Sequence, residues 1–130
     1  GMVRDYVAEG YPPDHPLVPH GMSVILNAPA VFRWTAPADP ARHLQAAELM
    51  GVDVRGAAPE DAGPILADAL IRIMQRLGIP NGLGGIGYTP DDIDALVAGT
   101  LPQRAVIELS PRPVTSDDLR AIFLDAMRYW

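Results

Sequence analysis

Cysteine and lysine are both missing from this 130-residue sequence. Without cysteine the chain can form no disulfide, cysteine-ligated zinc site, iron–sulfur cluster or catalytic thiol. All ten basic residues are arginines, against sixteen acidic residues, and the net charge of −6 argues against sequence-independent binding of nucleic acid. Long apolar runs are missing too. Residues 16–32 carry no formal charge but contain three prolines, so we expect no membrane span.

No basic segment followed by an apolar run opens the chain, so no secretory signal is predicted and the expected location is cytoplasmic. Gly1 before Met2 is interpreted as the remnant of an expression tag. The length then predicts one domain over residues 2–130. Hydrophobic residues make up 48% of the chain, which is enough to build a core.

Apolar residues recur with the helical period of 3.6, and no alternating strand pattern appears. Residues 22–34 are apolar nearly all round and predict a central buried helix that Pro29 kinks or divides. The clearest helix covers residues 65–77 and stops at Gly78. Other helices are predicted from Asp39-Pro40 to Gly51, from the cap Thr89 to Gly99, over residues 102–108, and from the cap Thr115 or Ser116 to Trp130. The predicted fold class is all-α, a multi-helix bundle.

The segment Gly82-Leu83-Gly84-Gly85-Ile86-Gly87 has the G-x-G-x-x-G spacing of dinucleotide-binding loops. That function needs a strand before the glycines and a helix that begins at them. Here a predicted helix precedes the glycines, and the next helix begins only after Thr89. We therefore interpret the segment as a connection between helices and expect no cofactor-binding residues.

Asp14, His15 and His20 lie close together in a proline-rich loop. Imidazole nitrogens and carboxylate oxygens are ligands for zinc or ferrous iron. Two histidines five residues apart are not an established metal spacing, so surface or capping histidines remain the alternative. His43 lies on an apolar helix stripe and is interpreted as a packed residue. The acidic clusters at residues 91–94 and 117–118 are interpreted as helix caps, and no catalytic residue is identified.

The histidine loop is followed by further characteristic segments in a fixed order. They are residues 14–24 (DHPLVPHGMSV), 28–32 (APAVF), 40–44 (PARHL), 61–63 (DAG), 66–68 (LAD), 87–88 (GY) and 99–103 (GTLPQ). This series resembles the iron-containing (group III) alcohol dehydrogenases, and most of all their hydroxyacid–oxoacid transhydrogenase branch. The resemblance covers essentially the whole chain, and it implies the distal part of the family's C-terminal helical domain.

The resemblance implies a divalent metal, iron or zinc, held by an aspartate and three histidines, and a nicotinamide nucleotide bound by a separate N-terminal domain. His20 matches one ligand histidine; His15 and Asp14 are candidates for the cleft beside it. The nucleotide-binding domain and the other ligand segments are expected to be absent from this chain. We therefore expect part of a metal-dependent, nicotinamide-linked oxidoreductase that is inactive alone and holds no cofactor alone, so whether the chain is itself an enzyme stays open.

The alternative function is a non-catalytic helical binding or assembly module that has kept the fold without the chemistry. Removal of the family's other segments should expose apolar surface on the helix predicted over residues 22–34. The expected partners are therefore a second copy of the chain or the missing nucleotide-binding domain, with neither nucleic acid nor membrane among them.

Overall fold

The computed structural model describes residues 4–12 and 14–130, and within these ranges the chain is helical. The α-helices are α1 (His20–Ile25), α2 (Ala28–Thr35), α3 (Pro40–Leu49), α4 (Ala62–Arg76), α5 (Ile93–Thr100), α6 (Arg104–Ile107) and α7 (Ser116–Asp125). Short 3-10 turns lie at η1 (Ala36–Ala38), η2 (Pro59–Asp61), η3 (Gly84–Ile86) and η4 (Pro90–Asp92). Strand pairing in the described residues is limited to an isolated bridge between Val7 and Leu17. The predicted all-α class is confirmed.

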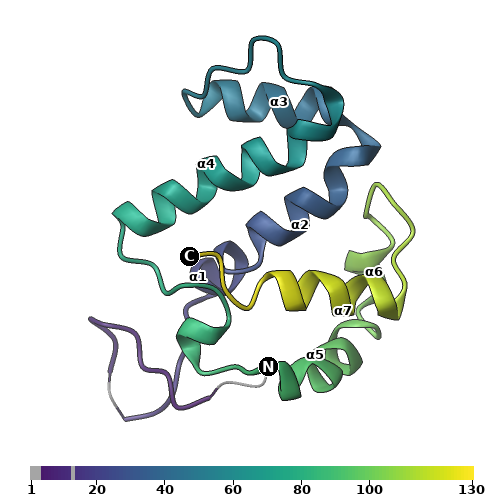
Figure 1. Cartoon of the computed structure of the whole chain (residues 1–130). Helices are drawn as coiled ribbons and strands as arrows, with labels where there is room; N and C mark the ends of the chain where they lie inside the picture. The colour runs from purple at the N-terminus through teal and green to yellow at the C-terminus, as the bar shows by residue number, and fades with distance from the viewer. Residues whose placement is uncertain (1–3, 13) are drawn as a thin grey trace.

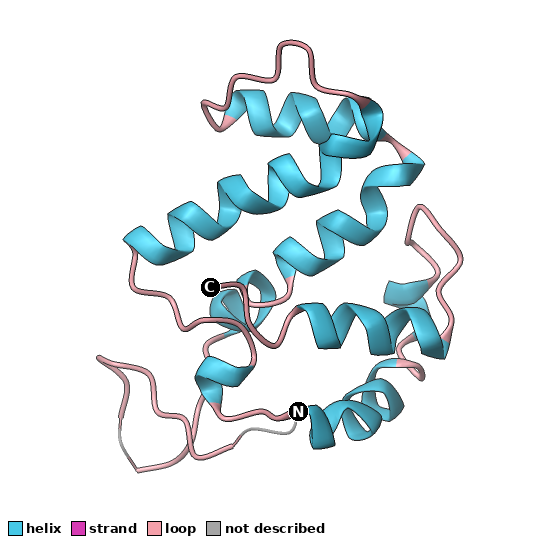
Figure 2. Ribbon diagram, in the orientation of Figure 1, coloured by secondary structure: helices cyan, strands magenta, loops and turns pink. Residues whose placement is uncertain are grey.

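Three helices form one stack, in which α4 lies between α3 and α2 (Figure 1). Helix α7 packs against α2 on one side and α5 on the other, so it joins the stack to the second group of helices. A long loop precedes α1, and others connect α3 to α4 and α6 to α7 (Figure 2). Among the described residues, no helix combines the length and apolarity needed to cross a bilayer.

Cap residues set the starts of α3 and α7 as predicted. The Asp39 carboxylate accepts a hydrogen bond from the backbone N–H of Arg42 at 3.1 Å, and Pro40 occupies the first turn of α3. Thr115 caps α7 in the same way, accepting from the N–H of Asp118 at 3.2 Å. The helix predicted over residues 65–77 is α4, and Gly78 follows it with a φ of +66°.

The helix predicted over residues 22–34 is two helices, α1 and α2, which separate at Leu26 and Asn27 rather than at Pro29. A proline lacks the N–H of a continuing helix, and its ring clashes with the carbonyl four residues before it. The i→i−4 hydrogen-bond pattern is therefore interrupted ahead of Pro29, although Leu26 and Asn27 keep helical dihedral angles, and Pro29 then sits in the first turn of α2. The expectation of a helix buried all round was wrong for α1, which has no buried residue.

Other predicted ends differ by one to five residues. Helix α5 runs through Gly99 to Thr100, and α6 covers only the centre of the predicted residues 102–108. Helix α7 stops at Asp125 instead of continuing to Trp130. The residues after it leave the helix because their backbone groups bond to the segment around Asn81.

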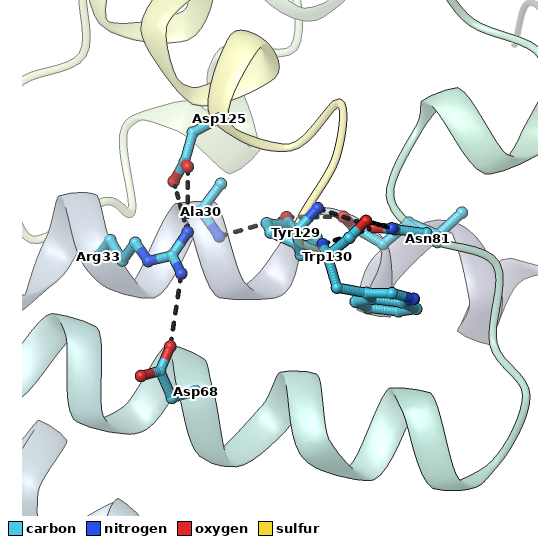
Figure 3. Close-up of polar contacts among 8 residues, drawn as sticks. Ala30, Arg33, Asp68, Asn81, Asp125, Tyr129 and Trp130 are labelled. Carbon is cyan, nitrogen blue, oxygen red and sulfur yellow. Dashed lines mark hydrogen bonds and ion pairs between the residues drawn. The ribbon is translucent and has the colours of Figure 1, made fainter.

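The main core lies where this C-terminal tail meets the junction of α1 and α2. Its buried members come from the junction, α4, the turn at residues 82–88 and the end of α7, and they are Leu26, Ala30, Met74, Leu83, Ile86, Tyr88, Ile122 and Ala126. The Tyr129 hydroxyl donates to the carbonyl of Leu26 at 2.9 Å and accepts from the N–H of Ala30 at 3.4 Å (Figure 3). The tail is therefore part of the core rather than a loose end.

Candidate functional site

His20 is the first residue of α1, and its side chain is exposed. Pro19 occupies the cap position before it, where φ is −55° and ψ is 143°, so the loop enters the helix in an extended conformation. The Ser23 hydroxyl donates to the His20 carbonyl at 2.8 Å and closes this short first turn. The backbone of His20 is thus held while its imidazole faces solvent.

Asp14 and His15 are exposed in the loop before α1, and they bond to each other, with 2.8 Å between Asp14 Oδ1 and His15 Nδ1. They do not assemble with His20. In the parts of the chain that the structure describes, no three histidines, aspartates or glutamates stand close enough to hold a metal ion. The metal implied by the sequence resemblance therefore does not fit the residues of this chain alone, because a single imidazole cannot hold it.

His43 is packed, as predicted. Its Nδ1 donates to the carbonyl of Asp39 at 2.8 Å, and its Nε2 lies 2.9 Å from the Thr35 hydroxyl oxygen. Its ring contacts Phe32 edge-on, with 5.8 Å between the ring centroids. Both ring nitrogens have protein partners, so His43 is a structural residue and offers no lone pair to a metal.

The glycine-rich segment bonds to the chain's own backbone. The N–H groups of Leu83 and Gly84 donate to the carbonyls of Ala126 and Met127, at 2.9 and 3.0 Å. A helix, α4, precedes the segment, and the described residues around it include no strand. These two amides face the C-terminal tail, as a connection between helices requires, and are not available to cradle a phosphate.

The acidic clusters cap helices. The Asp92 carboxylate is buried, accepts from the Thr89 N–H at 2.9 Å, and pairs with Arg4. Asp118 accepts from both the hydroxyl and the N–H of Thr115 and from the Trp34 indole, and these hydrogen bonds lower the pKa of its carboxyl. The carboxylates therefore stabilise helix starts.

A pocket of about 410 Å³ opens beside the start of α1. It is bordered by the α1–α2 junction, the turn at residues 82–88, α5 and α7. Val18 and Ser23, which flank His20 in sequence, both line it. Asn27 also lines it and was missed by sequence reasoning, although an asparagine within the apolar residues 22–34 was a signal that could have been followed.

Comparison with known proteins assigns the chain to a family. Residues 16–127 match the model of the Fe-containing alcohol dehydrogenase family, C-terminal part. The chain belongs to the iron-containing alcohol dehydrogenase family. The resemblance inferred from the sequence is thereby confirmed, and the helical domain described above is the family's C-terminal part.

Similar curated members of this iron-containing alcohol dehydrogenase family are longer proteins. The chain is 49% identical over 130 residues to the mitochondrial hydroxyacid-oxoacid transhydrogenase of Rattus norvegicus, covering 100% of this chain and 28% of that protein. It is 50% identical over 130 residues to the protein of the same name from Xenopus laevis, again covering 100% of this chain and 28% of the relative. Both relatives are named as mitochondrial, so the cytoplasmic location expected from the sequence stays a prediction.

A solved structure of an iron-containing alcohol dehydrogenase relative has the same fold. The crystal structure of a 1,3-propanediol oxidoreductase superposes on this chain with a TM-score of 0.75 and 28% sequence identity. The match covers 84% of this chain and 28% of that one. The arrangement of helices in Figure 1 is therefore a segment of a known, larger architecture.

Proposed function

We propose that this chain is the helical, metal-side part of an oxidoreductase similar to hydroxyacid-oxoacid transhydrogenase, and that His20 is one of the ligands to its metal. The observation that carries the proposal is an exposed imidazole at the start of α1, beside a pocket, within a segment that matches the family model. Members of the family are expected to bind a divalent metal ion, and we propose that the His20 imidazole is one of its ligands.

The remaining ligands and the nicotinamide nucleotide site belong, in this proposal, to protein segments that match other parts of the relatives. Two observations support this division. The described residues contain no cluster of three histidine, aspartate or glutamate side chains that could hold a metal ion, and two amides of the glycine-rich turn are bonded to the tail. The chain alone is therefore expected to be inactive with hydroxyacids and to hold neither metal nor nucleotide.

A chimera tests the proposal. The 28% of the rat transhydrogenase that matches this chain is replaced by residues 2–130, and metal content and hydroxyacid turnover are measured. We expect a metal-loaded, active chimera and at least a ~10-fold loss of metal affinity in the His20→Ala chimera, because mutating even a hydrogen-bond partner of a metal ligand typically costs ~10–100-fold. His15→Ala, in the same loop and also exposed, is the matched control and keeps the metal.

A measurement of unfolding free energy distinguishes a ligand role of His20 from a role in folding. Because the His20 side chain is exposed, His20→Ala should change the unfolding free energy of the isolated chain by no more than ~0.5 kcal/mol. Metal retention in the His20→Ala chimera would refute the assigned ligand, and turnover by the isolated chain would refute the division of the site.

The second candidate function, a non-catalytic assembly module, is favoured by the apolar residues that the structure leaves exposed around α6. Val106 and Leu109 are 68% and 84% exposed. In that case the chimera would fold and bind its partners but remain inactive, whatever residue stands at position 20.

A further inference from the structure

Asn81 binds the C-terminal tail through its side-chain amide (Figure 3). Its Oδ1 accepts hydrogen bonds from the backbone N–H groups of Tyr129 and Trp130, at 2.8 and 3.3 Å. Its Nδ2 donates to the Trp130 carbonyl. One half-buried side chain therefore makes three hydrogen bonds to the tail, and we call this arrangement the tail clasp.

The residue after Asn81 is Gly82, and an asparagine followed by glycine is the sequence most open to loss of the side-chain amide. In that reaction the backbone nitrogen of the following residue attacks the side-chain carbonyl carbon. Glycine has no side chain to hinder the attack, and its backbone bends easily into the ring that forms. Asn27, the chain's other asparagine, is followed by Ala28, whose Cβ hinders the same attack.

The reaction at Asn81 needs only hydroxide and water. The Gly82 N–H gives its proton to hydroxide, and the nitrogen forms a bond to Asn81 Cγ. The Cγ–Nδ2 bond breaks, and Nδ2 takes up a proton from water and leaves as ammonia. Water then opens the succinimide ring at one or the other of its carbonyls, which gives aspartate or isoaspartate at position 81.

The tail clasp opposes this reaction in the folded chain. Ring closure draws Asn81 Cγ and Oδ1 toward the Gly82 nitrogen and removes Nδ2, so the clasp has to open first. The reaction therefore proceeds through a state with a detached tail, and its rate follows the population of that state. The Tyr129 hydroxyl, bonded to Leu26 and Ala30, helps to keep the tail attached.

The isoaspartate product does not restore the clasp. It inserts an extra backbone carbon directly before Gly82, whose backbone already lies against the tail: a Cβ on Gly82 would be 2.4 Å from the Ala126 carbonyl oxygen. The extra carbon displaces the Leu83 and Gly84 N–H groups from the tail carbonyls to which they donate. The aspartate product loses the bond to the Trp130 carbonyl, because a carboxylate oxygen cannot donate to it.

We propose that Asn81 is a site of spontaneous deamidation that the tail clasp protects, and that conversion to isoaspartate irreversibly detaches the C-terminal tail from the core. The reaction uses neither metal nor nucleotide, so its test is independent of the proposed function. Each opening of the tail thus exposes the chain to a slow, one-way loss of its C-terminal packing.

The test follows the tryptic peptide of residues 77–104, which contains Asn81. The 130-residue chain is kept in mildly alkaline buffer, either folded or unfolded in guanidinium chloride, and deamidation is measured by mass spectrometry. We expect Asn81 to convert in the unfolded chain and to convert at least ~10-fold more slowly in the folded chain. The peptide of residues 5–33, which contains Asn27, is the internal control and should convert more slowly than the Asn81 peptide in the unfolded chain.

A variant that loosens the tail distinguishes protection by the clasp from protection by burial alone. Tyr129→Phe removes the hydroxyl that bonds to Leu26 and Ala30. It should speed deamidation of the folded chain ~2–10-fold, the range expected when a hydrogen bond that holds the tail is lost. Tyr11→Phe, which changes an exposed phenol, is the matched control and should keep the wild-type rate.

Hydrogen exchange tests the effect of the product on the tail. The isoaspartate form is made by deamidating the unfolded chain and then removing the denaturant. Its Leu83 and Gly84 amide hydrogens, which bond to the tail in the unmodified chain, should exchange at least ~10-fold faster than those of the unmodified chain.

The proposal is overturned if Asn81 keeps its amide in the unfolded chain, or if the folded and unfolded chains convert at the same rate. A wild-type rate in folded Tyr129→Phe overturns it too, as does unchanged exchange in the isoaspartate form. Should Tyr129→Phe fail to fold, the ratio of the folded to the unfolded rate in the wild-type chain still decides.

Discussion

Gly82 is the residue at which the backbone has least freedom to accept a side chain. Its φ is +65°, and a Cβ at this position would lie 2.4 Å from the Ala126 carbonyl oxygen and 2.7 Å from that of Met127. Both distances are far below van der Waals contact. Glycine is required here because the turn and the C-terminal tail approach each other backbone to backbone.

We predict that Gly82→Ala lowers the free energy of unfolding by more than ~2 kcal/mol, since it combines a strained φ with a clash against backbone atoms that cannot rotate away. Urea denaturation measures this. Gly99→Ala is the control, because Gly99 lies within α5 and an added Cβ there would meet no atom within 4 Å. It should gain ~0.5–1 kcal/mol, and similar losses for both variants would contradict the prediction.

The glycine-rich segment and Asn27 show how much of a residue's role can be predicted from the sequence alone. Sequence context was enough to reject a nucleotide loop, because a helix precedes the glycines. It could not identify their partners, which lie over forty residues later in the chain and are backbone atoms. Asn27 was missed for a similar reason. It lines a pocket that four distant segments form together.

At the scale of elements, α2 is tied to both of its neighbours by polar contacts. Arg33 on α2 lies 3.0 Å from Asp125 in the last turn of α7 and 3.6 Å from Asp68 on α4 (Figure 3). Tyr129 adds a half-buried contact, since its hydroxyl bonds to the α1–α2 junction. Burial raises the pKa of Tyr129 to about 12.

This raised pKa predicts a loss of stability in alkali. In the unfolded chain a tyrosine ionises near pH ~10, whereas folded Tyr129 resists ionisation up to about 12. Its contribution is therefore complete below pH ~10 and is lost as the pH rises from there to about 12.

Chemical denaturation at a series of pH values measures the effect. Tyr129→Phe should be less stable than wild type at neutral pH, having lost the bond to Leu26, but should decline less steeply between pH ~10 and ~12. Tyr11→Phe, which changes an exposed phenol, is the control and should follow the wild-type curve. Identical alkaline slopes for Tyr129→Phe and wild type would contradict the assignment.

Helix starts were predicted more successfully than helix packing. Asp39 and Thr115 could be recognised as caps because capping depends on residues within one turn of each other. The division between α1 and α2 was placed too late by two residues, since the apolar pattern continues through it. Distant segments decide which face of α1 is covered, and the apolar pattern of α1 itself does not predict where those segments lie.

For the molecule as a whole, exposed apolar side chains are spread over several elements, and one set of them lies on and around α6. Val106 and Leu109 are 68% and 84% exposed, and Leu101 before α6 is 39% exposed. Sequence reasoning expected such a surface on residues 22–34, where Val24 is exposed. The residues around α6 expose three large apolar side chains, against Val24 within residues 22–34, and exposed apolar surface favours association.

We therefore predict that the isolated chain self-associates, with an average mass by sedimentation equilibrium that rises with concentration. The double variant Val106→Glu/Leu109→Glu should shift the equilibrium toward monomer. Leu49→Glu/Leu77→Glu, which places the same charges at equally exposed leucines of α3 and the end of α4, should not. A wild-type monomer at every workable concentration would refute the prediction.

The bonds between residues 82–84 and residues 126–127 also set an order of events during synthesis. A ribosome adds ~5–20 residues per second, so the glycine turn waits roughly 2–9 s for its partners to be made. Throughout that interval Leu83 and Ile86 lack the α7 side of their core. The nascent chain thus presents apolar side chains that the finished fold conceals, and this is the stage at which it is most open to aggregation or to capture by a chaperone.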